Sequence, residues 1–107
     1  MTDEHLPFTA VRADGVRTIH FPLHTHTVNP RHVGAVLEAV LAAVTERIRA
    51  EGGVSDGDLL QGICMAMAIR MDMVDAQPAA VRALVSRSLE EADDAVAESV
   101  VRPGGKA

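Results

Sequence analysis

The sequence has no tryptophan, no tyrosine and a single cysteine, and its aromatic side chains are limited to two phenylalanines. Its core must therefore be built from aliphatic side chains and methionine. One cysteine, Cys64, cannot form a disulfide within the chain, and its apolar surroundings predict a buried thiol. These features indicate a reducing, cytoplasmic location.

Clusters of basic residues are also absent. The formal net charge is −5, and no segment has the excess of Lys and Arg that binding to nucleic acid or to an anionic membrane requires. The first residues, MTDEHLPF, carry acids where a signal peptide needs bases, and no apolar run approaches the roughly 20 residues of a membrane span. We therefore expect neither nucleic acid nor membrane as a partner.

Length and composition are ordinary for a small globular protein. The chain has 107 residues, of which 48% are hydrophobic and 23% charged. A chain of this size can bury enough surface to fold without a metal or a disulfide. We predict a flexible N-terminal arm (1–7), a single α+β domain (8–101) and a disordered tail (102–107).

A β-hairpin is predicted near the N-terminus. Asp14-Gly15 lies between two segments with β-branched residues, which favours a two-residue turn of type I′. This turn pairs Phe8 with Phe21, and we expect the face that carries them to be buried. Pro22 lacks an amide donor, so the second strand must be an edge there or leave the ladder. The apolar residues that share the buried face are Phe8, Ala10, Ile19 and Phe21.

Two amphipathic helices are predicted around a central one. Asn29 as N-cap and Pro30 as first helical residue start a helix over 30–51, which Gly52-Gly53 ends. Pro78 starts another that extends to about residue 101. The short link at Gly52-Gly53 predicts that the first and central helices pack as an antiparallel hairpin.

The central stretch, Val54–Val74, has almost no polar side. Ser55 followed by Asp58 resembles a capping box with Asp in place of Glu. Between Leu59 and Ile69, Gln61 is the one strongly polar residue. A helix that is apolar nearly all round belongs in a core or a subunit interface, so we expect this helix to be buried.

Small residues on the central helix predict close packing. Gly62 and Ala66 lie one turn apart, as do Cys64 and Ala68, and such pairs let a neighbouring backbone approach. The predicted fold class is therefore α+β and mainly helical. An N-terminal β-hairpin is followed by three helices (ββααα), with the central helix buried.

Histidines provide the most suggestive group for chemistry. In an extended segment the side chains of His24 and His26 point the same way and could share a divalent metal ion, with His20 as a third ligand. His32 lies nearby in the first turn of a predicted helix. The alternative is that these histidines are solvated or cap turns, since no H-E-x-x-H or C-x-x-C motif accompanies them. We expect no cofactor, with a divalent metal as the alternative.

Four methionines lie on the central helix. Thioethers can bind Cu(I), but only Met67 and Met71 stand at i, i+4, so three sulfurs cannot converge within one helix. We interpret the methionines as core residues or as a pliable surface for a partner. The candidate interface residues are Met65, Met67, Met71 and Met73.

No catalytic machinery is evident. The neighbouring acids of Glu90-Glu91 and Asp93-Asp94 diverge around a helix, and the glycine pairs lack a phosphate-binding frame. We identify no catalytic and no cofactor-binding residue. The leading interpretation is a small cytoplasmic interaction or regulatory module that forms a homodimer or binds a partner protein. The alternative is a divalent-metal-binding protein, or a small metal-dependent enzyme, that uses His24 and His26.

Overall fold

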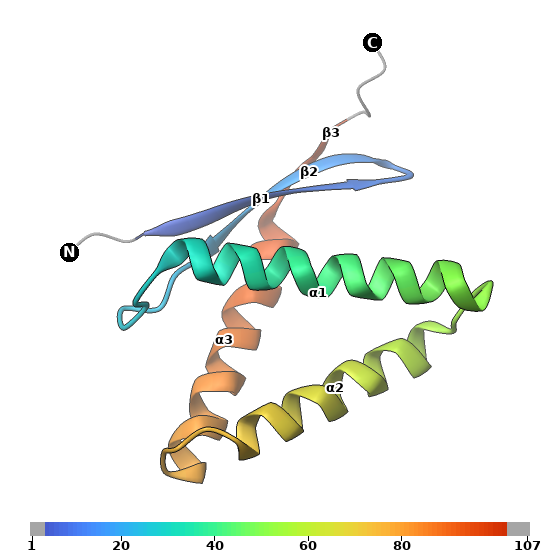
Figure 1. Cartoon of the computed structure of the whole chain (residues 1–107). Coiled ribbons are helices and arrows are strands. Elements are labelled where there is room, and N and C mark those ends of the chain that lie inside the picture. Colours follow the sequence, from blue (N-terminus) through green and yellow to red (C-terminus); the bar gives the residue numbers. More distant parts are fainter. Residues whose placement is uncertain (1–3, 103–107) are drawn as a thin grey trace. The chain divides into compact units, whose positions relative to one another are not determined.

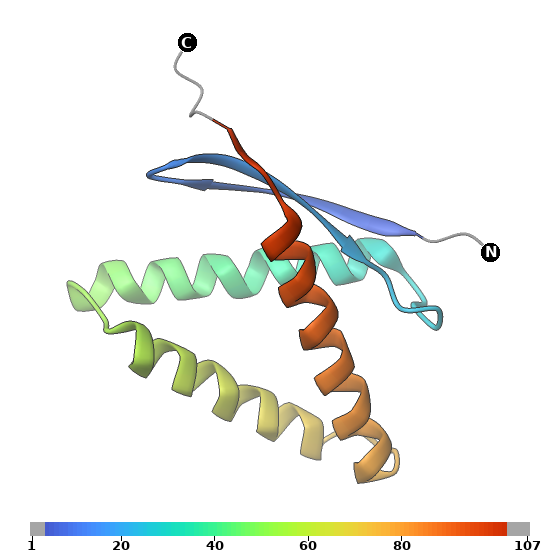
Figure 2. The same ribbon diagram turned by 180° about the vertical axis from the view of Figure 1, so that it is seen from behind.

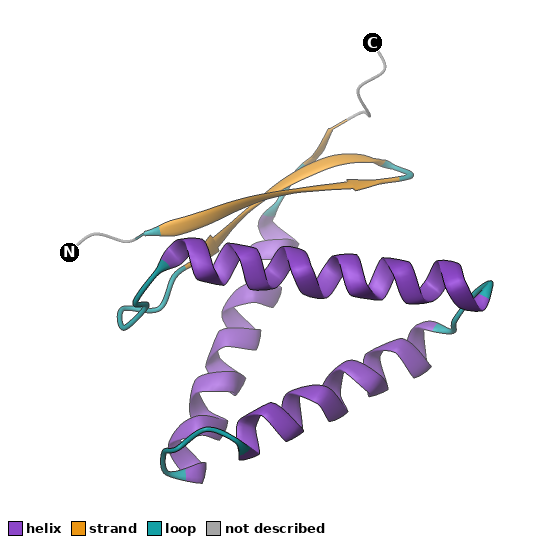
Figure 3. Cartoon of the chain, viewed as in Figure 1, coloured by secondary structure: helices purple, strands orange, loops and turns teal. Residues whose placement is uncertain are grey.

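The structure is a computed structural model that describes residues 4–102 (Figure 1). Its elements confirm the predicted ββααα order of an α+β fold and add a short third strand (Figure 3). In chain order they are β1 (His5–Arg12), β2 (Gly15–Pro22), α1 (Pro30–Glu51), α2 (Asp56–Asp72), α3 (Pro78–Glu98) and β3 (Val101–Arg102).

The chain divides into two compact units. Unit 1 comprises Met1–Gly34 and Ser86–Ala107, and so contains the sheet, the start of α1 and the later part of α3. Unit 2 comprises Ala35–Val85, with the rest of α1, all of α2 and the start of α3. The single domain expected over 8–101 therefore stays a prediction.

The hairpin of unit 1 differs from the predicted one by two residues. Strands β1 and β2 are antiparallel, and Phe8 lies opposite Ile19 rather than opposite Phe21. The turn is formed by Ala13-Asp14, because Gly15 already belongs to β2 and has a φ of 142°, which favours glycine. A shift of two residues does not change the face of the sheet on which each side chain lies. The predicted faces are therefore correct, although the predicted register is wrong.

One face of the hairpin is covered, and it is the predicted one. Ile19 is only 6% exposed, while Phe8 and Phe21 on the same face are half-buried. The opposite face is open to solvent, as Val11 with 77% exposure shows. The prediction that the phenylalanine face is the buried one is confirmed.

Both helices of unit 1 contact this covered face. A Cβ added to Gly34 of α1 would lie 3.5 Å from the Leu6 side chain. From β2, Arg17 Nη1 donates to the carbonyl of Val96 near the C-terminus of α3, at 3.4 Å, where a cation is favoured by the helix dipole. Ala95 in the same turn is buried. The hairpin core is thus completed by residues from distant parts of the sequence.

The hydrogen-bond pattern of the hairpin explains how its strands accommodate two prolines. Leu23 N–H donates to Glu4 O at 2.9 Å, which makes these two residues a hydrogen-bonded pair. Hydrogen-bonded and non-hydrogen-bonded pairs alternate along an antiparallel ladder, so Pro7 and Pro22 both fall in non-hydrogen-bonded pairs. Their nitrogens therefore point away from the partner strand, where no amide donor is needed. At Pro22 strand β2 has β1 as its only neighbour among the described strands, so the predicted edge position is confirmed.

Strand β1 begins at His5 rather than at Phe8. Residues 5–7 therefore belong to the sheet and not to the predicted arm, because they pair with the last residues of β2. The remainder of that arm, residues 1–3, lies outside the described residues.

The C-terminal end also differs from the prediction. Helix α3 ends at Glu98, and Val101–Arg102 form β3, antiparallel to Val16 and Arg17 of β2. The helix prediction extended too far because the local valines also suit a strand. Arg102 was assigned to the predicted tail and is part of the sheet, and residues 103–107 lie outside the described part of the chain.

In unit 2 the start of α2 is as predicted, but its packing is not. Ser55 Oγ accepts from the Asp58 N–H at 3.1 Å, which caps the helix. No residue of α2 is buried, so the prediction that the central helix is buried is wrong for the single chain. Helices α1 and α2 diverge from their link instead of packing as a hairpin (Figure 2), and a Cβ on Gly62 would meet nothing within 4 Å.

Within residues 4–102 no helix has the length and apolarity to cross a bilayer.

The covered face of the hairpin can be tested by paired truncations. Ile19→Ala should lower the free energy of unfolding by about 2–4 kcal/mol, because it removes buried methyl groups and leaves a cavity. Val11→Ala, on the open face, should change it by less than about 0.5 kcal/mol. Urea denaturation measures both, and equal effects would contradict the assignment of the two faces.

Candidate interaction site on helix α2

Helix α2 exposes a large amount of apolar side chain. Ile69 is 63% exposed and Leu60 is 61% exposed, values typical of polar surface residues. Large apolar side chains that stay exposed in this number on one helix mark a candidate interaction site. We call the exposed set the α2 apolar surface; it consists of Leu60, Ile63, Met65, Met67, Ile69 and Met73.

The arrangement follows from the sequence of α2, which has apolar residues on opposite sides. With 3.6 residues per turn, Leu60, Met67 and Met71 fall on one side, and Ala66 and Ile69 on the other. A neighbour on one side therefore leaves the other uncovered. Covering the whole helix requires contacts from at least two directions.

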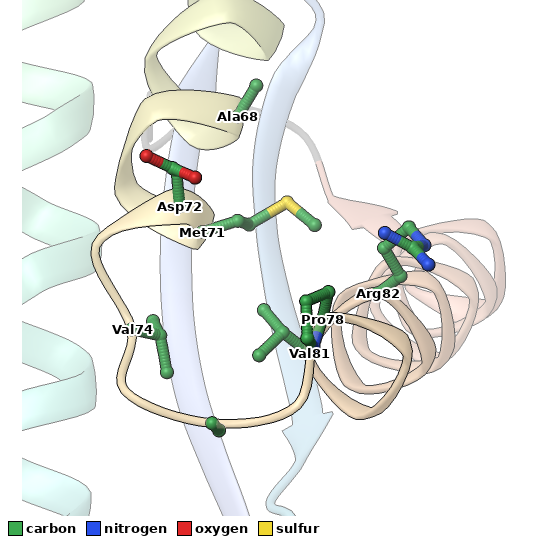
Figure 4. A pocket seen from close by; sticks show the side chains of 8 residues that line it. Ala68, Met71, Asp72, Val74, Pro78, Val81 and Arg82 are labelled. Atoms are coloured by element: carbon green, nitrogen blue, oxygen red, sulfur yellow. The ribbon is translucent and has the colours of Figure 1, made fainter.

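The start of α3 covers the first of these sides only in part. A pocket of about 330 Å³ lies at the α2–α3 corner, where the Met71 and Val81 side chains approach each other (Figure 4). Val81 is buried, at 8% exposure. An adjoining apolar cavity of about 320 Å³ is lined by both of these residues with Met67, Leu84 and Val85. The packing of α2 is thus begun at its C-terminal end and left incomplete.

The four candidate interface methionines fall into two pairs. Met67 and Met71 line the apolar cavity with α3, whereas Met65 and Met73 are not among its lining residues. Arg70 Nη1 lies 3.3 Å from the sulfur of Met73. The role of these methionines as an interface stays a prediction, and so does the expectation that no three of their sulfurs bind a copper ion.

Cys64 is exposed, not buried as its neighbours in the sequence predicted. An apolar sequence neighbourhood implies burial only where another element covers the helix. The thiol lies on α2, which has no buried residue, so its exposure has the same cause as that of the α2 apolar surface.

The structure places His24 and His26 together, but in a turn and not in an extended segment. Their ring centroids are 5.4 Å apart, and the His26 N–H donates to His24 Nδ1 at 3.1 Å. A neutral imidazole that accepts at Nδ1 carries its proton on Nε2. Metal binding by His24 would therefore break this hydrogen bond or displace that proton.

The other candidate ligands lie apart from this pair. His20 is on the open face of β2, and His32 Nε2 lies 3.4 Å from Asn29 Nδ2 at the start of α1. Asn29 Oδ1 accepts from the Arg31 N–H at 3.0 Å, which confirms Asn29 as the N-cap. Across residues 4–102, no three side chains of His, Cys, Asp or Glu gather in a way that could hold a metal ion.

Comparisons with known proteins add no assignment: no protein-family model, no curated protein and no solved structure matches this chain. The function must therefore be inferred from the geometry and chemistry of its own residues.

The histidine turn leads to a measurable expectation. With only two imidazoles at hand and one nitrogen engaged, Zn(II) should bind no tighter than about 100 μM, roughly 5.5 kcal/mol. Isothermal titration calorimetry of the untagged protein measures this. Tighter binding that disappears in the His24→Ala, His26→Ala double variant would show that the turn rearranges into a metal site.

Proposed function

We propose that this chain is a small interaction module that acts as a homodimer, in which a second copy covers the α2 apolar surface. The observation that carries the proposal is that α2, an almost wholly apolar helix, has no buried residue. Each Å² of apolar surface removed from water contributes about 25 cal/mol, so this surface strongly favours association.

A second copy is the covering partner that requires the fewest assumptions. Every copy presents the same apolar helix, and symmetric pairing through identical surfaces is the commonest form of assembly in soluble proteins. The methionines support this, because flexible thioether side chains adapt to an apolar partner without a fixed pocket. A partner protein with a matching apolar helix is the other occupant that the same surface would accept.

Charge supports the same class of function. The net charge of −5 and the scattered bases favour a protein partner over nucleic acid or an anionic membrane. The proposal places the module in the cytoplasm, in keeping with its unpaired cysteine.

A divalent-metal role for His24 and His26 is the second candidate. Their ring separation of 5.4 Å favours it. The engaged Nδ1 of His24 and the lack of a third ligand in the described range weigh against it. We therefore rank the interaction role first.

The oligomeric mass tests the proposal. Light scattering coupled to size exclusion at micromolar concentration should give twice the 11.3 kDa chain mass. Dilution should shift the protein towards the single-chain mass. A mass of one chain at every concentration up to the millimolar range would contradict the homodimer.

A charge placed on α2 should weaken the dimer selectively. Ile69 is exposed in the single chain, so Ile69→Asp should leave the subunit fold intact but bury an unpaired carboxylate in the dimer. We expect its dissociation constant to rise by at least about 100-fold, measured by sedimentation equilibrium. Gln61→Asp introduces the same residue into the same helix at a polar position, with a helix-propensity cost at least as large, and is the matched control. Equal dissociation constants for Ile69→Asp and the parent would mean that Ile69 stays exposed.

A further inference from the structure

One side of α2 is exposed from Asp58 to Met73. The start of α3 lies against another side of this helix, where Met67 and Met71 line the shared cavity. Residues spaced by three and four positions lie on one side of a helix, and six such residues of α2 are all exposed. We call this side the outer face of α2; it consists of Asp58, Gly62, Met65, Ala66, Ile69 and Met73.

The outer face has matching positions on either side of its midpoint. The midpoint lies between Met65 and Ala66, and Gly62 stands as far before it as Ile69 stands after it. If a two-fold axis passes through this point, two antiparallel α2 helices place Ile69 of each copy opposite Gly62 of the other. A bulky side chain then meets a position without one, so the two helices can approach closely.

The two ends of the outer face carry opposite charges. Asp58 lies in the first turn of α2 and Arg70 in its last turn. Arg70 Nη1 lies 3.3 Å from the sulfur of Met73, which holds the guanidinium at the Met73 end of the face. Within residues 4–102 neither charge has an oppositely charged partner. Since Asp58 and Met73 are equally far from the midpoint, the antiparallel pairing brings Asp58 of each copy beside Arg70 of the other.

A parallel pairing of the same faces lacks this match. Identical positions of two parallel helices meet each other, so Ile69 would meet Ile69 and Asp58 would meet Asp58. Two bulky side chains at one level hold the helices apart, and two like charges repel each other. A partner of different sequence would need its own small residue and its own charges at the matching positions. A second copy of this chain supplies all of them.

These observations define how the second copy binds. We propose that the outer faces of two α2 helices pack antiparallel about a two-fold axis at their midpoint. Ile69 of each copy packs on Gly62 of the other, and Asp58 of each copy pairs with Arg70 of the other. The inference rests on the proposed homodimer and specifies its interface. Apolar burial supplies the affinity, and the two ion pairs fix the direction and register of the helices.

Substitution of Gly62 tests the close contact. A Cβ on Gly62 meets nothing within 4 Å in the single chain, so Gly62→Leu should favour the helix itself. In the dimer the new side chain would occupy the place of Ile69 from the other copy, and the dissociation constant should rise at least about tenfold. Gly57→Leu makes the same change in open space away from the outer face and is the matched control. Equal dissociation constants for the two leucine variants would contradict the contact at Gly62.

Exchange of charges between two variants tests the antiparallel direction. Asp58→Arg and Arg70→Asp each turn both ion pairs into repulsive contacts, so each variant alone should dimerise at least about tenfold more weakly than the parent. In an equimolar mixture the arginines of one variant meet the aspartates of the other, and both pairs are attractive again. Sedimentation equilibrium should therefore show a mixture that dimerises about as tightly as the parent. Mixing restores no interaction within a chain, so the recovery reports the contact between copies.

Asp56→Arg is the matched control for this exchange. It removes an acid from the same turn of α2, at a similar cost to the helix dipole, but on the side opposite to Asp58. Its mixture with Arg70→Asp should not recover the parent affinity. A parent that dimerises, with no recovery in the first mixture or equal recovery in both, would overturn the antiparallel arrangement and leave the homodimer standing. A single-chain mass for the parent itself would overturn the homodimer and this arrangement with it.

Discussion

Removal of apolar surface from water is the interaction on which the rest of this structure depends, and the single chain achieves it only in part. In unit 1, Ile19 and Ala95 are buried between the hairpin and its helices. In unit 2, Val81 is the buried apolar residue among those described, while α2 remains uncovered. Since the stability of a small protein is a narrow balance between burial and chain entropy, a partner that covers α2 would add directly to the stability of the fold.

Local signals in the sequence account for most of the secondary structure. The Ser55 and Asn29 caps act within three residues of chain, so each start of a helix can be predicted without knowledge of the fold. The face of the hairpin was predictable because alternation depends only on parity, whereas its register depended on the conformation of Gly15. Strand β3 pairs with residues of β2 that lie more than 80 positions earlier in the chain, Val16 and Arg17, and no local pattern encodes that contact.

Local patterns in the sequence were also insufficient to predict the candidate sites. An all-round apolar helix predicts that α2 must be covered, but the pattern is identical for a core helix and for an interface helix. The prediction of burial was wrong for the single chain, because the periodicity of a helix does not show which other element, if any, packs against it. Similarly, the spacing of His24 and His26 suggested a shared ligand, and the structure brings them together through a turn whose hydrogen bond engages one of the nitrogens.

The central claim is that a second copy covers α2, and hydrogen–deuterium exchange of its backbone amides tests it most directly. An isolated, uncovered helix opens readily, whereas a helix buried in an interface is protected in proportion to the stability of that interface. The account predicts that amides within Asp56–Asp72 exchange more slowly as protein concentration rises from micromolar to millimolar, while β1 and β2 change little. Exchange in α2 that is fast and independent of concentration would contradict the account.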